Sequence, residues 1–178
     1  ILSKFLFIMY WKKSVKYAFS HVLDLSNLSF LINFLFIALK VSLNTAHPFL
    51  ETLNKLRPSR IGHGVRSVEN KSLLKELKTN NIHLELCLTS NMVTKVYKSL
   101  KDHPIDFLYQ NDFSISINTD GRTIADTDLN NEYDILSTQF NWVKSNFLKV
   151  NIKSMEASFA SSHTKTKIIS LLKSSYNL

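Results

Sequence analysis

Apolar and polar residues alternate in short blocks along the second part of the chain. Residues 82–88 and 113–117 place an apolar side chain at every second position, which is typical of β-strands. The segment 60–64, Arg-Ile-Gly-His-Gly, reads as a shorter strand that ends in a histidine between two glycines. The pattern therefore predicts three strands, at 60–64, 82–88 and 113–117.

Apolar residues at helical spacing fill the intervals between these strands and the region after them. Asn70 is placed to cap one helix, and Pro104 suits the first turn of another. Strands that start roughly 20 to 30 residues apart, with helices between them, indicate parallel βα units and so an α/β fold. In addition to the helix that starts at Pro104, the spacing of apolar residues predicts helices at 70–80, 93–100, 129–149, 154–159 and 164–172.

Polar side chains follow each predicted strand at its C-terminal end. His63 follows the first strand, Thr-Ser-Asn at 89–91 follows the second, and Asp120 follows the third. Open α/β sheets and (β/α)8 barrels place their chemistry at this end of the strands. The sequence therefore predicts a functional site at these three positions.

Residues 1–50 differ from residues 51–178, and we treat them as a separate, atypical apolar segment. Seven of the twelve phenylalanines lie in the first segment, and residues 30–39 are apolar apart from Asn33. A membrane span needs about 20 apolar residues, and this run is shorter and is followed by Lys40, so it does not establish a membrane association. A buried helix, a membrane-associated segment and sequence that does not belong to the fold all stay open.

The formal net charge of +8 comes from basic residues that are not arranged as in a nucleic-acid-binding protein. Residues 1–50 contain five lysines and one acid, Asp24, whereas residues 51–178 contain seventeen basic and thirteen acidic residues. In the second region the signs are interspersed and no basic run alternates with aromatic residues, so we expect no nucleic-acid partner. Cys87 is the single cysteine, which excludes an internal disulfide framework. Together with the lack of a signal-peptide pattern, it predicts a cytoplasmic location.

Three strand-end motifs occur in a fixed order: 60–64 (Arg-Ile-Gly-His-Gly), 85–91 (Glu-Leu-Cys-Leu-Thr-Ser-Asn) and 117–120 (Ile-Asn-Thr-Asp). With His103-Pro104, Glu132-Tyr133 and the Glu-Ala-Ser-Phe at 156–159, they resemble the adenosine deaminase family over about residues 56–172. The resemblance implies the last three or four βα units of a (β/α)8 TIM-type barrel, followed by C-terminal helices. It also implies zinc-dependent hydrolysis of a purine nucleoside, adenosine, to inosine and ammonia.

The resemblance assigns roles to two strand-end residues. Asp120 matches the family's zinc-ligand aspartate, and His63 matches the histidine that orients or polarises the attacking water. Zinc lowers the pKa of a bound water, so that hydroxide is available near neutral pH. Gly121 stands where many members carry a second aspartate that binds N7 of the purine. Adenine therefore stays an alternative substrate to adenosine.

Other residues in the same motifs are interpreted as structural. Ser90 and Asn91 match a family motif that we expect to shape a loop. Glu85 alternates with apolar neighbours, and we interpret it as a carboxylate that pairs with a basic neighbour. None of the three is predicted to take part in the chemistry.

Most of the family's metal site has no counterpart in this sequence. The family takes two zinc-ligand histidines from a His-X-His motif, and a third histidine with the proton-donating glutamate from His-Ala-Gly-Glu; neither motif occurs here. His21, His47 and Glu51 lack the flanking residues, and we assign them no role. We therefore expect a truncated or frameshifted deaminase that is inactive as given. A non-catalytic half-barrel relic or interaction protein is the alternative, and a small membrane-associated protein is a third.

Overall fold

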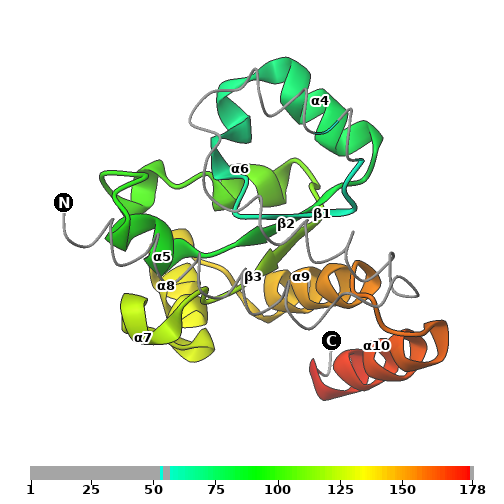
Figure 1. The fold of residues 1–178 in the computed structure, drawn as a ribbon. Helices are drawn as coiled ribbons and strands as arrows, with labels where there is room; N and C mark the ends of the chain where they lie inside the picture. Colours follow the sequence, from blue (N-terminus) through cyan, green and yellow to red (C-terminus); the bar gives the residue numbers. More distant parts are fainter. Residues whose placement is uncertain (1–52, 54–56, 177–178) are drawn as a thin grey trace, which may run out of the picture. The chain divides into compact units, whose positions relative to one another are not determined.

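The computed structural model describes residue 53 and residues 57–176 of the chain. The predictions for residues 1–50, including the apolar run at 30–39, lie outside the described residues. The boundary placed after residue 50 lies outside them as well. Figure 1 shows the described part as a small sheet with helices around it.

Three short parallel strands form the sheet: β1 (Arg60–Gly62), β2 (His83–Leu86) and β3 (Ile115–Ile117). They lie in the order β1-β2-β3, with Ile61 paired to Leu84 and Leu84 paired to Ile115. Parallel neighbours need a crossover connection, which the helices between the strands supply. The predicted strands and their βα arrangement are therefore confirmed, although each strand is shorter than predicted.

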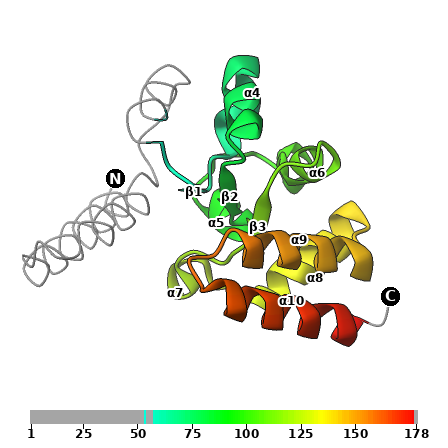
Figure 2. The ribbon, with the colours of Figure 1, turned by 90° about the vertical axis from the view of Figure 1, so that its right-hand side faces the viewer.

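Helical elements follow each strand. They are η2 (Val65–Glu69) and α4 (Lys71–Thr79) after β1; α5 (Leu88–Val93), η3 (Leu100–Asp102) and α6 (Ile105–Gln110) after β2; and α7 (Arg122–Ala125), α8 (Leu129–Phe140), α9 (Lys144–Glu156) and α10 (Ser162–Tyr176) after β3. Helices α9 and α10 lie side by side in both views (Figure 1 and Figure 2). Asn70 caps α4 as predicted, because its Oδ1 accepts the N–H of Leu73 at 3.0 Å. Within the part that the structure describes, no helix has both the length and the apolar character that crossing a membrane requires.

The helix predicted at 93–100 is wrong. Helix α5 already ends at Val93, and Lys95 takes a left-handed φ of 58°, a conformation that cannot continue an α-helix. The helix starts at Leu88, inside the predicted strand. Its first backbone N–H groups donate to the Glu132 carboxylate, which lies 44 positions further along the chain. Local spacing does not reveal such a contact.

The single long helix predicted at 129–149 is also wrong. Helix α8 ends at Phe140, and Asn141 takes a left-handed φ of 56° while its backbone N–H donates to the Leu136 carbonyl. Asparagine tolerates this conformation at a helix end. The segment predicted as a helix at 154–159 contains the end of α9, and α10 is longer than the predicted 164–172.

The sheet has one apolar face and one polar face. Ile61, Leu84 and Ile115 are register partners on the apolar face and belong to one core cluster with buried leucines of α4 and α6. On the other face, Arg60 Nε donates to Glu85 Oε1 at 2.8 Å. This contact confirms that Glu85 pairs with a basic neighbour.

Candidate functional site

His63 and Asp120 come together beyond the C-terminal ends of the strands. His63 directly follows β1, and Asp120 follows β3 after a short turn. The His63 Nε2 atom lies 3.5 Å from Asp120 Oδ2, and 12% and 19% of the two side chains are exposed. The two residues thus face each other although β2 separates their strands. The structure brings the two candidates together, and their chemical roles stay predictions.

The backbone at His63 explains the glycine that follows it. The His63 N–H donates to the Glu85 carbonyl at 2.8 Å, which extends the strand pairing by one residue. His63 and Gly64 then take positive φ angles of 60° and 66°, which turn the chain away from the sheet. A Cβ atom on Gly64 would lie 2.9 Å from Leu84 Cδ2, so this position needs glycine for its conformation and for its space.

Helix α5 contributes a polar contact to each candidate residue. The Ser90 hydroxyl donates to Asp120 Oδ2 at 3.1 Å, and Asn91 Nδ2 lies 3.2 Å from His63 Nδ1. Both α5 side chains are buried. Their interpretation as residues of a shaping loop is therefore corrected: they lie in a helix and contact the candidate site directly.

His103 lies behind Asn91, and its neighbours in the sequence do not predict a part for it in the site. His103 Nε2 is 3.0 Å from Asn91 Oδ1, and the Ile105 backbone N–H donates to His103 Nδ1 at 3.2 Å. Burial, with the charge of His63 as a smaller cause, lowers the pKa of His103 to about 4. The His103 ring is therefore neutral near pH 7. The His103-Pro104 motif was visible in the sequence, but nothing in it indicated a contact with Asn91.

Glu132 anchors the helix that carries these contacts. Its carboxylate is fully buried, and Oε2 accepts the backbone N–H groups of Leu88 at 3.0 Å and Thr89 at 3.3 Å. Its Oε1 accepts the Thr127 hydroxyl at 3.0 Å. A carboxylate at a helix N-terminus satisfies backbone donors that have no partner within the helix. Glu132 therefore holds the start of α5 in place.

Gly121 lies at the exposed rim directly after Asp120. Its φ is −75°, which any residue adopts. The atoms nearest to a Cβ there would belong to the Ile124 side chain, at an ordinary contact distance of 3.6 Å. The backbone therefore does not require glycine at this position, and the predicted part of Gly121 in substrate binding stays a prediction.

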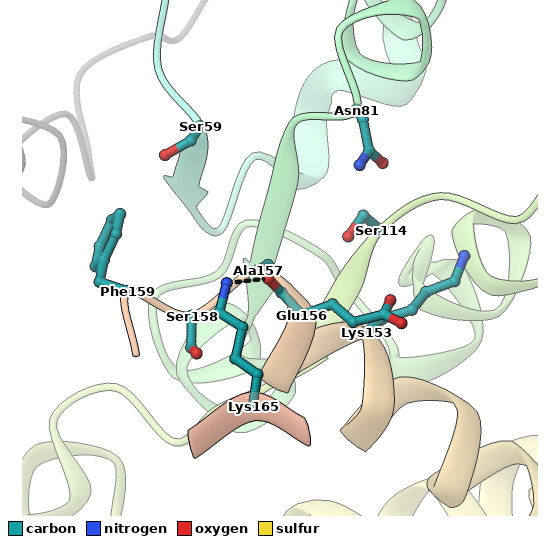
Figure 3. A pocket seen from close by; sticks show the side chains of 9 residues that line it. All are labelled: Ser59, Asn81, Ser114, Lys153, Glu156, Ala157, Ser158, Phe159 and Lys165. Carbon is teal, nitrogen blue, oxygen red and sulfur yellow. Dashed lines mark hydrogen bonds between the residues drawn. The ribbon is translucent and has the colours of Figure 1, made fainter. Parts of the chain in front are cut away.

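A cavity of about 370 Å³ lies at the opposite end of the sheet (Figure 3). Its lining includes Ser59, Asn81 and Ser114, each of which precedes a strand. The Lys165 ammonium group beside it donates to the Glu156 carbonyl at 2.7 Å. The cavity is thus separate from His63 and Asp120, which follow their strands.

Zinc needs more ligands than the described residues bring together. Among residues 53 and 57–176, no three histidine, cysteine, aspartate or glutamate side chains are grouped so as to hold a metal ion. Zinc sites use three or four protein ligands, and Asp120 offers one carboxylate. The described residues therefore do not form a zinc site by themselves.

We expect the free energy of unfolding to fall as the pH drops below about 6.5, because two buried histidines stay neutral in the folded chain. Burial, with Arg60 and Lys153 as smaller causes, lowers the pKa of His83 to about 3, and that of His103 is about 4. The unfolded chain takes up these protons near pH 6.5, whereas the folded chain does not. The neutral histidines therefore contribute their full stabilisation above this pH. At about pH 5, protonation of each histidine in the unfolded chain lowers the free energy of unfolding by about 2 kcal/mol.

Urea unfolding at about pH 7.5 and about pH 5 measures this loss. The His83→Gln variant should lose less stability between the two pH values than the original chain. His163→Gln, at an exposed position of α10, is the matched control and should keep the original pH dependence. Equal pH dependence in all three proteins would contradict the prediction.

Comparison with known proteins assigns the chain to a family. The sequence model of the family described as "Adenosine deaminase" matches residues 43–175. The chain is 37% identical to the adenosine deaminase of Plasmodium gallinaceum over 127 residues, which are 71% of this chain and 34% of that protein. It is 36% identical to the adenine deaminase of Mesorhizobium japonicum over 120 residues, which are 67% of this chain and 37% of that protein. The chain thus spans about a third of the length of these relatives.

A solved structure extends the likeness to the fold. The adenine deaminase of Arthrobacter aurescens superimposes with a TM-score of 0.72 and 21% identity, over 76% of this chain and 41% of that one. At this identity the likeness concerns the fold, which is a partial α/β barrel with three parallel strands. The match to the family model and the identity to the sequence relatives also show which family the chain belongs to. The chain belongs to the adenosine deaminase family.

Proposed function

We propose that this chain forms the C-terminal part of a hydrolytic purine deaminase that converts adenosine to inosine and ammonia. The observation that carries the proposal is the 3.5 Å separation of His63 Nε2 and Asp120 Oδ2 beyond the strand ends. Both residues lie inside the segment that matches the family. The 37% identity to an adenosine deaminase supports adenosine as the substrate.

In the proposed site, His63 orients the attacking water and Asp120 is a metal ligand. The imidazole nitrogen and the carboxylate oxygen are close enough for one water molecule to contact both. A water held in this way is already oriented toward the carbon that bears the amino group, which lowers the entropic part of the barrier. Ser90 and Asn91 keep the two groups in place through their contacts to Asp120 and His63.

Adenine is the second candidate substrate. Gly121 offers no side chain to N7 of the purine, so the N7 contact that a second aspartate makes in many family members is missing at this position. The 36% identity to an adenine deaminase supports this candidate. Zinc as the metal is proposed from the family, and the predicted cytoplasmic location stays a prediction from the sequence.

A chimaera tests the proposed function. Residues 57–176 replace the matching segment of the Plasmodium gallinaceum enzyme, and the conversion of adenosine and of adenine is followed by separating substrates from products. We expect inosine and ammonia from adenosine, at a rate well above that of a chimaera that carries both His63→Ala and Asp120→Ala. Faster conversion of adenine than of adenosine would select the second candidate.

Folding of the chimaera is checked by circular dichroism and by a cooperative thermal transition. A folded chimaera that converts neither purine would contradict the proposal. That result would favour the alternative prediction, a half-barrel without catalysis that acts in an interaction.

A further inference from the structure

We propose that Asn91 and His103 hold His63 as the neutral tautomer whose proton is on Nε2. His63 then directs an N–H group, and not a lone pair, toward Asp120 and toward any water bound between them. Asn91 and His103 are positioning residues in this proposal. Its consequence for catalysis rests on the proposed function, whereas the tautomer itself does not.

The direction of the hydrogen bonds is set first at His103. A backbone N–H can only donate, and the Ile105 N–H lies 3.2 Å from His103 Nδ1, so this ring nitrogen accepts. The neutral ring then carries its proton on Nε2. His103 is 3% exposed, and its neutral state near pH 7 follows from burial.

The second step orients the amide of Asn91. His103 Nε2 donates to the Asn91 oxygen Oδ1 at 3.0 Å, because a protonated ring nitrogen needs an acceptor. The Nδ2 group of Asn91 therefore points the other way, toward His63 Nδ1 at 3.2 Å. Amide orientation is often ambiguous, but here the backbone donor at Ile105 fixes it through His103.

The third step assigns the proton of His63. The Asn91 amide N–H donates to His63 Nδ1, so that nitrogen carries the lone pair and Nε2 carries the proton. His63 Nε2 faces Asp120 Oδ2, which also accepts the Ser90 hydroxyl. In its neutral form His63 therefore presents an N–H donor, and not a proton acceptor, to the candidate site.

Nitrogen NMR of the 178-residue chain tests the tautomer without any need for catalysis. At about pH 8, long-range ¹H–¹⁵N correlation spectra separate protonated from unprotonated imidazole nitrogens. We expect His63 Nε2 in the protonated range and Nδ1 in the unprotonated range. A His63→Gln variant assigns the signals.

The Asn91→Asp variant reverses the direction of the last contact. A carboxylate accepts from both neighbours, so the His63 proton should move to Nδ1 and the Nε2 signal should shift to the unprotonated range. Asn81→Asp makes the same change at an exposed position, and it should leave the His63 signals unchanged.

Two results would overturn the proposal. One is a spectrum of the original chain with a proton on His63 Nδ1, alone or together with Nε2. This result would contradict the proposal even if Asn91→Asp does not fold. The other is a folded Asn91→Asp variant with unchanged His63 signals. An inactive chimaera with the expected wild-type spectrum would instead count against the proposed function alone.

Discussion

Replacing His63 by alanine in the chimaera should lower kcat for adenosine by about 10²-fold or more, because the attacking water loses the group that orients it. The imidazole lies 3.5 Å from Asp120, and the backbone turn at Gly64 and the contact with Asn91 fix its position. Steady-state kinetics with adenosine measures the effect. We expect KM to change much less than kcat, because the orientation of the water acts on the chemical step.

The matched control is His163→Ala, which removes the same side chain from an exposed position of α10. It should leave both kcat and KM unchanged. A thermal unfolding curve for each variant separates a catalytic effect from a loss of folded protein. Equal values of kcat for the His63→Ala chimaera and its parent would contradict the role of His63.

Replacing Glu132 by alanine should destabilise the folded chain by about 3 kcal/mol. The buried carboxylate accepts the backbone N–H groups of Leu88 and Thr89, and alanine leaves both donors without this acceptor. The Thr127 hydroxyl loses its acceptor on Oε1 as well. Urea unfolding of the variant and of the original chain, at equal pH, measures the difference in the free energy of unfolding.

Two further variants sharpen this test. Glu132→Gln keeps one side-chain oxygen as an acceptor, so it should lose less stability than Glu132→Ala. We expect its free energy of unfolding to fall by about 1 kcal/mol. Glu156→Ala removes an exposed carboxylate near the end of α9 and should have little effect. A Glu132→Ala variant as stable as Glu156→Ala would show that the carboxylate does not hold α5.

Much of the fold could be predicted because its signals are local. The alternation at 82–88 and 113–117 locates β2 and β3, and the strand ends place His63 and Asp120 at the same end of a parallel sheet. Parallel pairing then brings the two side chains to 3.5 Å, although 57 positions separate them in the sequence.

The bounds of two helices, α5 and α8, could not be predicted, because they depend on features that apolar spacing does not record. Helix α5 starts where Glu132 reaches it from α8, and it ends before the left-handed Lys95. The predicted long helix breaks at Asn141, whose positive φ interrupts an otherwise continuous amphipathic pattern. The local pattern therefore located apolar faces better than helix ends.

The contacts around His63 illustrate the same limit for the site. His63, Asn91 and His103 lie far apart in the sequence, and only the fold brings them into one row of hydrogen bonds. The motifs that contain them are recognisable in the sequence, but a motif does not show which of its side chains contacts which residue of another motif. The direction of the hydrogen bonds depends on the Ile105 backbone N–H, which no motif records.

The most direct test of the account is the zinc content of the chimaera with and without Asp120. Metal analysis after gel filtration, on the same samples whose adenosine conversion is measured, should find about one zinc ion per active chain. The Asp120→Ala chimaera should lose zinc and activity together. Full zinc and an unchanged rate in that variant would contradict the placement of Asp120 in a deaminase centre.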